Sequence, residues 1–229
     1  MPAFAEYVKT AISVDNVIFG FDEGDLKVLL IKRGAAPYDG MWALPGDLVN
    51  PKEDIDAACT RVLSELTGIQ NVFLEQVHTF GRVDRHPLGR VITVAYIALI
   101  KIADYQLTPA SFAQQASWHS FSRVGDLAFD HNEILTACYY ALRQKVRIKP
   151  IGFELLPERF TLTQLQHLYE AVLETDLDKR NFRKKITSMN LLTDTFETQD
   201  NVSHRPAKLY QFDKSRYKQF VTNGFIFDI

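Results

Sequence analysis

The stretch GDLVNPKEDIDAACTRVLSELTGI, residues 46–69, decides how the first part of this chain folds. Residues 54–66 are long enough for about three helical turns, and Gly68 stands in the C-cap place. Apolar residues recur along this segment at the intervals of one helix face, at Ile55, Ala58, Cys59, Val62 and Leu66. We therefore predict a helix over residues 54–66 whose apolar face packs into a core.

Charged residues accompany this apolar face. Arg61 and Glu65 are four residues apart, the spacing at which an ion pair forms along a helix. Positions 62, 65 and 66 project to one side of this helix, and Glu65 is the one carboxylate among them. Magnesium takes about six oxygen ligands, so one carboxylate is a poor start for a magnesium site. Structural ion pairing is the simpler interpretation of Arg61 and Glu65.

The segments around this helix predict a sheet. Residues 10–21 and 26–33 are rich in Val, Ile, Leu and Phe and are joined by Asp22-Glu23-Gly24-Asp25, a hairpin signal. Further elements are expected in the order strand 41–44, turn Pro45-Gly46, strands 73–80, 90–102 and 116–121, and helix 131–145. The fold class is therefore α/β, with the sheet assembled around the 54–66 helix.

Counted back from Gly68, the opening stretch resembles the Nudix box, G-x5-E-x7-R-E-U-x-E-E-x-G-U, in which U is aliphatic. The residues that stand where this pattern requires them are Glu53, Arg61, Leu63, Glu65, Gly68 and Ile69. The flanking segments VLLIKR, WALPGD, TFGRVDRHPLGRVITVAYIAL and LAFDHNEIL extend the resemblance over roughly residues 8–145. It implies an α/β/α sandwich with a ligand cleft between the sheet and the box helix.

Three positions depart from the Nudix pattern. Its first glycine falls on Asp47, and Val62 and Leu66 replace two of the three glutamates that follow the arginine. These glutamates hold the catalytic cations in working Nudix hydrolases, so we expect no enzyme activity, no metal and no cofactor. The alternative is an active hydrolase of nucleoside diphosphate derivatives such as ADP-ribose, with Glu65 and Glu53 holding magnesium.

Charge is divided unevenly along the chain. The net charge is −2, yet residues 1–142 carry 11 Lys and Arg against 17 Asp and Glu, whereas residues 143–229 carry 15 against 11. The resulting balances of −6 and +4 suggest two functions in one chain.

The basic segment RQKVRIK, residues 143–149, is expected to be a linker, since it leads into Pro150, where a helix is disfavoured. We expect an effector-binding domain over residues 1–148 and a second domain over residues 149–229. The elements expected in the second domain are a helix from the capping-box sequence at Thr161, a helix over 178–191, and a hairpin from 193–198 and 206–212.

A helix, a turn, a basic helix and a hairpin together predict a winged helix-turn-helix domain. Phe182, Ile186 and Met189 form the inward stripe of the basic helix. In this arrangement the second helix enters the major groove of DNA and the hairpin touches phosphates. The candidate DNA-binding residues are Lys179, Arg180, Asn181, Arg183, Lys184, Thr187, Arg205 and Lys208. A basic surface that holds another protein is the alternative.

Both halves together resemble one family. An impaired Nudix box followed by DKRNFRKKI, residues 178–186, and RPAKLYQF, residues 205–212, is similar to the Nudix-related transcriptional regulators of bacteria. This resemblance implies a homodimer that holds a DNA operator and senses a small metabolite in the Nudix cleft. Overall similarity favours the branch that responds to L-arabinose and controls carbohydrate-utilisation genes. The alternative is the branch that responds to ADP-ribose and controls NAD metabolism.

A sugar site needs an aromatic wall and a few polar groups that hold hydroxyls. The candidate ligand-binding residues are Lys32, Trp42, Arg61, Glu65, Phe80, Asp84 and Arg90. Trp42 and Phe80 are also the kind of residue found in cores. Arg82, Arg85 and Arg90 have the alternative of being solvated loop charges. For ADP-ribose, these arginines would pair with phosphate.

Cys59 and Cys138 are the two cysteines, and both lie in apolar helical patterns without metal-ligand spacing. Buried thiols in a cytoplasmic protein are therefore expected. No charged region followed by an apolar one opens the chain, and the longest apolar run, residues 91–100, is too short to cross a bilayer. We expect neither secretion nor membrane insertion.

Overall fold

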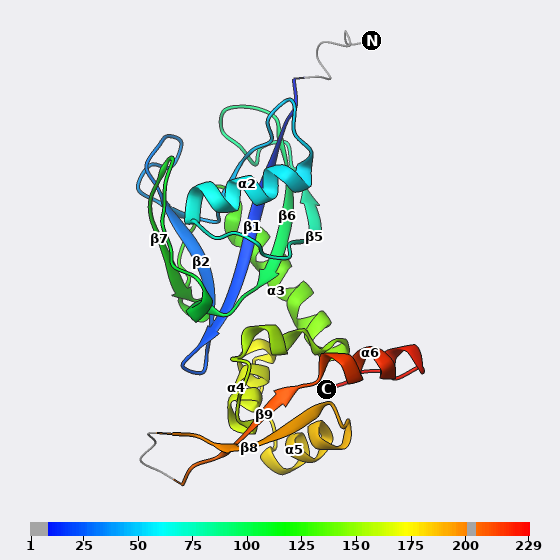
Figure 1. Cartoon of the computed structure of the whole chain (residues 1–229). Helices are drawn as coiled ribbons and strands as arrows, with labels where there is room; N and C mark the ends of the chain where they lie inside the picture. Colours follow the sequence, from blue (N-terminus) through cyan, green and yellow to red (C-terminus); the bar gives the residue numbers. More distant parts are fainter. Residues whose placement is uncertain (1–8, 201–204) are drawn as a thin grey trace. The chain divides into compact units, whose positions relative to one another are not determined.

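The computed structural model describes residues 9–200 and 205–229. The chain divides into two compact units (Figure 1). Residues 142–229 and 21–26 make one unit, and the other residues up to 141 make the other. The boundary expected between residues 148 and 149 lies near this division in the sequence and stays a prediction.

The first unit is built on a seven-stranded mixed sheet. Its strands are β1 (Ala11–Asp22), β2 (Asp25–Arg33), β3 (Trp42–Ala43), β4 (Gly46–Leu48), β5 (Glu75–Phe80), β6 (Val91–Leu99) and β7 (Ala113–Ser120). They lie in the order β3-β2-β1-β6-β5, with β4 paired to β1 and β7 paired to β2. Only β1 and β6 pair in parallel among the described strands. Both are buried along most of their length, which explains their unbroken apolar sequences.

Successive residues of β1 point to opposite faces of this sheet and reach different helices. Ile18 packs with Leu63 of α2 (Ile55–Thr67). Phe19 contacts Phe121, whose ring lies 4.2 Å from that of Tyr139 in α3 (His131–Ile148). Two short 3-10 helices, η1 (Ile102–Asp104) and η2 (Phe121–Arg123), complete the connections. The expected α/β/α sandwich is confirmed.

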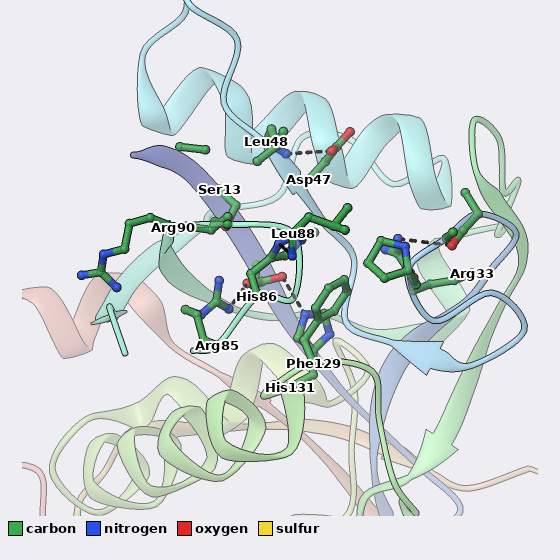
Figure 2. A pocket seen from close by; sticks show the side chains of 18 of the residues that line it. Ser13, Arg33, Asp47, Leu48, Arg85, His86, Leu88, Arg90, Phe129 and His131 are labelled. Carbon is green, nitrogen blue, oxygen red and sulfur yellow. Dashed lines mark hydrogen bonds and ion pairs between the residues drawn. The ribbon is translucent and has the colours of Figure 1, made fainter. Parts of the chain in front are cut away.

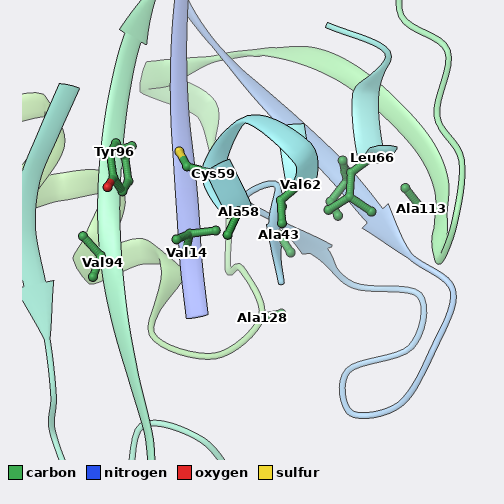
Figure 3. Packing of buried hydrophobic residues seen from close by; sticks show 11 residues of the cluster. Val14, Ala43, Ala58, Cys59, Val62, Leu66, Val94, Tyr96, Ala113 and Ala128 are labelled. Carbon is green, nitrogen blue, oxygen red and sulfur yellow. The ribbon is translucent and has the colours of Figure 1, made fainter. Parts of the chain in front are cut away.

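The Nudix-box helix α2 is held by its apolar face. Its C-cap Gly68 has a φ of +81°, in the left-handed region that glycine adopts without strain. Figure 3 shows the cluster formed by this face and the sheet, which includes Val14, Ala43, Ala58, Cys59, Val62, Leu66 and Val94. Full burial of a Val or Leu side chain contributes about 1.5–3 kcal/mol, so this packing stabilises α2 strongly.

The second unit has winged helix architecture. Its elements are η3 (Pro150–Leu155), α4 (Leu162–Leu173), α5 (Lys179–Ser188), β8 (Leu192–Thr198), β9 (Lys208–Phe212) and α6 (Lys214–Thr222). The predicted capping box is present, because Thr161 accepts from the Gln164 backbone and the Gln164 side chain accepts from the Thr161 backbone. Phe182 and Ile186 of α5 are buried with Tyr169 of α4 in the core of this unit.

Most predicted elements are confirmed, with ends shifted by a few residues. The elements that were not anticipated are β4, which begins at Gly46 of the predicted Pro45-Gly46 turn, α6, and the 3-10 helices η1, η2 and η3. The predicted linker 143–149 is also wrong for most of its length, because α3 continues to Ile148. Cys59 and Cys138 are buried, as expected. No helix in the described part of the chain is long and apolar enough to cross a membrane.

Candidate functional site

A cleft of about 500 Å³ opens on the first unit (Figure 2). Its walls come from β1, from the loop after β2, from β4, from residues 85–91, and from the start of α3. The side chains that give it chemical character are Lys9, Asp15, Arg33, Asp47, Arg85, His86, Arg90, Phe112, Phe129 and His131. Sequence segments from residue 9 to residue 131 thus converge on one site.

Buried charges form one end of this cleft. The Arg85 guanidinium binds the Asp130 carboxylate through two hydrogen bonds, from Nε at 2.9 Å and from Nη2 at 2.7 Å. Arg85 Nη2 also lies 3.7 Å from Asp15 Oδ2. All three side chains are almost fully buried. Removing one partner of such a network leaves an uncompensated charge, so the network fixes the 81–90 loop against the start of α3.

His131 joins the network as a neutral ring. The backbone N–H of Leu44 donates to His131 Nδ1 over 2.9 Å, so the ring proton sits on Nε2. Nε2 lies 3.3 Å from Asp15 Oδ1, and the Thr93 hydroxyl donates to Asp15 Oδ2 over 2.7 Å. Burial lowers the pKa of His131, which agrees with a neutral ring. The ring therefore positions Asp15 without adding charge.

Aromatic rings line another part of the cleft. The His86 ring stacks on Phe129, with centroids 5.1 Å apart and planes at 13°. The Arg33 guanidinium lies 5.0 Å from the centroid of Phe129 and 5.1 Å from that of Phe112. Burial, followed by the charge of Arg85, lowers the pKa of His86, so its ring is neutral at pH 7. The wall offers flat apolar surface next to cations.

Basic side chains outnumber acidic ones around the cleft. Four basic residues line it, namely Lys9, Arg33, Arg85 and Arg90, against the carboxylates of Asp15 and Asp47. Asp130 adds a third carboxylate behind Arg85. An excess of basic groups beside aromatic rings suits an anionic ligand that carries a flat ring system.

Gly46 is required where β4 passes β1. Asp15 pairs with Gly46 in the register of these strands. A Cβ at position 46 would lie 1.9 Å from Asp15 Oδ1 and 2.9 Å from the Val14 carbonyl oxygen. Only glycine fits there, since the neighbouring atoms belong to backbone and to a buried carboxylate.

Of the seven predicted ligand-binding residues, Arg90 alone lines this cleft. The other six lie elsewhere. Lys32 and Trp42 are cross-strand partners on β2 and β3, and Trp42 packs against His119. Phe80 is buried at the end of β5, and Asp84 is exposed and paired with Arg82. Ligand binding by these residues stays a prediction.

The remaining two, Arg61 and Glu65, stabilise α2. The Arg61 guanidinium binds Glu53 through Nε at 3.0 Å and through Nη2 at 2.6 Å. It also donates to the Leu48 carbonyl and to Glu65, each over 3.0 Å. The ion pair expected at this spacing is confirmed. Arg61 thereby ties the box helix to β4, whose residues line the cleft.

The alternative that Arg85 is a solvated loop charge is wrong, because this side chain is buried between Asp15 and Asp130. Arg33, His86 and Phe129 were absent from the predicted set. No spacing signal connects them, since they come from the end of β2, the loop before β6 and the segment before α3, which only the fold brings together. The one local signal nearby is Asp130, an acidic residue directly before α3, because a carboxylate is favoured at the start of a helix.

Of the three box positions that carry glutamates after the arginine in the Nudix pattern, only position 65 has a carboxylate in this chain. Val62 and Leu66 are fully buried in the apolar cluster, and Glu65 lies at the surface, paired with Arg61. Glu53 is engaged by the same arginine. Among the described residues, no group of three His, Cys, Asp or Glu side chains is placed to hold a metal ion. Carboxylates around one cation are what the family's chemistry needs.

The basic helix α5 presents the predicted DNA-binding side chains on its outer face. The exposed members are Lys179, Arg180, Asn181, Lys184 and Thr187. The Asp178 side chain caps the helix by accepting from the Asn181 backbone N–H. Arg183 differs, because it is half-buried and donates to the Thr163 hydroxyl of α4 over 2.9 Å. On the hairpin, Arg205 is exposed and Lys208 pairs with Asp194 over 3.0 Å.

Two family models match the chain in sequence. Residues 9–138 match the NUDIX domain, and residues 152–212 match the NrtR DNA-binding winged helix domain. A protein of Acinetobacter baylyi named ADPR responsive transcriptional repressor NtrR is 36% identical over 217 residues, which cover 93% of this chain and 86% of that protein. The chain belongs to the NrtR family. Its fold, and the presence of a Nudix domain and a winged helix domain in one chain, are those expected from the sequence.

Solved NrtR structures are similar to both parts of this chain. Shewanella oneidensis NrtR in complex with a 27mer DNA is 30% identical, with a TM-score of 0.73, covering 88% of this chain and 93% of that one. The NUDIX domain of the same protein complexed with ADP ribose is 29% identical, with a TM-score of 0.55, covering 62% and 99%. The expected response to L-arabinose finds no support in these similarities.

Proposed function

We propose that this NrtR-family chain is a transcriptional repressor whose operator binding is controlled by ADP-ribose in the Nudix cleft. One observation carries the proposal. A DNA-binding winged helix domain is joined to a Nudix unit in which buried apolar residues stand at two box positions that have glutamate in the Nudix pattern. The Acinetobacter baylyi relative, described as an ADPR responsive repressor, supports the same function. Genes of NAD metabolism are then the expected targets.

The chemistry of the cleft supports a nucleotide over a pentose. A volume of about 500 Å³ suits a ligand of nucleotide size, and a pentose would fill only a fraction of it. The stacked pair of His86 and Phe129 offers surface for a base, and Arg90 and Lys9 offer charge for a diphosphate. L-arabinose is neutral and has no aromatic ring, so it would use neither feature.

The proposal includes binding without hydrolysis. Val62 and Leu66 occupy core positions where the Nudix pattern has glutamates, so the charge that would anchor cations and activate water is missing there. A repressor of this kind would release its effector unchanged. Incubation of ADP-ribose with the chain and magnesium or manganese should yield no AMP or ribose 5-phosphate. AMP release that disappears in Glu65→Gln would establish the hydrolase alternative instead.

Control of DNA binding requires that the effector favour one state of the protein, since equal affinity for two states shifts nothing. We propose a homodimer whose two winged helix domains occupy two half-sites of one operator. Sedimentation should give a mass twice the chain mass of 26.2 kDa. Operator and effector both occur in the cytoplasm, which agrees with the location expected from the sequence.

Thermal shift and gel shift together test the proposal. ADP-ribose should raise the melting temperature, because a ligand that binds only the folded state stabilises it, and L-arabinose should not. The DNA would be a duplex selected by the chain from random sequence, and ADP-ribose should change its retention. His86→Ala should weaken the response to ADP-ribose, whereas the control His78→Ala, outside the cleft, should not. A response to L-arabinose and not to ADP-ribose would overturn the proposal that ADP-ribose is the effector.

A further inference from the structure

The hairpin of the winged helix domain carries an unusual aromatic residue. Phe196 of β8 is 94% exposed, more than any other large apolar side chain in the described part of the chain. Water contact with a whole phenyl ring is unfavourable, so the fold gains nothing from this placement. Its position in the hairpin of a DNA-binding domain suggests a partner outside the chain.

The backbone at Phe196 is arranged to display this ring. Asp194 pairs with Tyr210 and Thr198 with Lys208, so three residues on β8 face one on β9. Within this bulge, Phe196 has a φ of +58°, a conformation that costs a bulky L residue about 1 kcal/mol or more. The Asp194 carboxylate holds it there by accepting from the Phe196 N–H over 2.8 Å. Strain that the fold maintains is typical of functional positions.

The charges beside Phe196 are paired with one another. Asp194 forms an ion pair with Lys208 over 3.0 Å, and Glu197 forms one with Arg159. A ring between neutralised charges contacts its partner through apolar surface. This property separates Phe196 from the exposed cations of α5, which would act on phosphates.

We propose that Phe196 is an apolar wedge that enters the minor groove and packs between base steps of the operator. Apolar side chains of this kind partly unstack a step and bend the duplex. Flexible pyrimidine–purine steps deform most easily, so the operator should carry one where the hairpin lands. The inference rests on the proposed DNA binding. It adds a residue whose binding depends on how easily a base step of the DNA deforms.

The test compares variants on one DNA, a duplex selected by the wild-type chain from a random pool. Phe196→Ala should weaken binding about tenfold and leave the salt dependence unchanged. Lys184→Ala should lower the slope of log affinity against log salt by about one. The matched control is Phe73→Ala, which removes a ring that is 82% exposed in the first unit and should leave binding unchanged.

Phe196→Gly separates a DNA role from a structural one. Glycine adopts a positive φ freely, so this variant should raise the melting temperature by about 2 °C while weakening DNA binding as Phe196→Ala does. Affinity of Phe196→Ala within twofold of wild type would overturn the wedge, as would a change in oligomer mass with DNA affinity intact. Failure of the wild-type chain to select any duplex would instead overturn the proposed function.

Discussion

The box helix α2 and the basic helix α5 share a plan and differ in what their charges do. Each buries an apolar stripe in its own unit and turns charged residues outward. On α2, Arg61 is bound by two glutamates and by the Leu48 carbonyl. On α5, the cations Lys179, Arg180 and Lys184 are exposed on the outer face.

This difference separates structural charges from binding charges. A cation that is held by carboxylates within the fold stabilises the fold, and its charge is not available to a ligand. An exposed cation keeps its charge for an external anion such as a phosphate. The same residue types on two amphipathic helices therefore predict different functions once their partners are known.

The largest expected effect comes from restoring a box carboxylate on α2. Val62→Glu places a charge in the apolar cluster and should lower the free energy of unfolding by roughly 3–5 kcal/mol, as an uncompensated buried charge does. Urea denaturation followed by circular dichroism measures this loss. Leu66→Met is the control for substitution in the same cluster, and it should cost less than about 1.5 kcal/mol. A stable Val62→Glu variant that hydrolyses ADP-ribose with magnesium would contradict the view that position 62 belongs to the apolar core.

The next effect falls on α5. The double variant Arg180→Ala, Lys184→Ala should weaken DNA binding roughly ten- to hundredfold at low salt and lower the salt slope by about two. Stability should change by less than about 0.5 kcal/mol, because both side chains are exposed. Arg183→Ala serves as the contrast, since its guanidinium donates to Thr163 and its loss should affect stability as well. Unchanged DNA affinity in the double variant would favour a protein partner for this face.

The sequence predicted these two helices because periodicity and caps are local. Apolar spacing located both stripes, and the Gly68 signal located the end of α2. It also predicted that Arg61 and Glu65 would pair, because the interaction lies within one helix. Such features depend on neighbours only a few residues away.

The cleft could not be predicted in the same way. Asp15, Arg85 and Asp130 lie far apart in sequence and meet through strand pairing and the approach of a loop to α3. Arg85 carries the same local signal as exposed Arg82, since both stand in a polar loop, yet one is buried and the other is not. Strand β4 was missed because it has only three residues and its first, Gly46, belongs to the Pro45-Gly46 turn signal.

A smaller effect distinguishes the two ion pairs of Arg61. Arg61→Met should lower the free energy of unfolding by about 1–2 kcal/mol, because it removes the hydrogen bonds that Arg61 donates to Glu53 and to the Leu48 carbonyl at a partly buried position. Glu65→Gln should cost only about 0.3–0.5 kcal/mol, the usual value for an exposed pair four residues apart. Equal losses in the two variants would mean that the tie between α2 and β4 adds nothing.

The smallest expected effect is a dependence of the Arg61 network on pH. The hydrogen bonds from Arg61, and then the Asn50 backbone N–H, lower the pKa of Glu53 from 4.5 to about 2. A carboxyl whose pKa is lower in the folded state stabilises the fold above its unfolded pKa and loses that contribution as pH falls. The stability difference between wild type and Glu53→Gln should therefore be constant above about pH 5.5 and should shrink between pH 4.5 and pH 2.

Urea unfolding of both proteins across this range measures the difference. In an Arg61→Met background the pH-dependent part should largely disappear, because the main cause of the lowered pKa is then absent. A difference that stays constant from pH 7 down to pH 2 would mean that Glu53 titrates alike in the folded and unfolded chains. The charges around α2 would then not be held within the fold, and the contrast between its paired charges and the exposed cations of α5 would be wrong for α2.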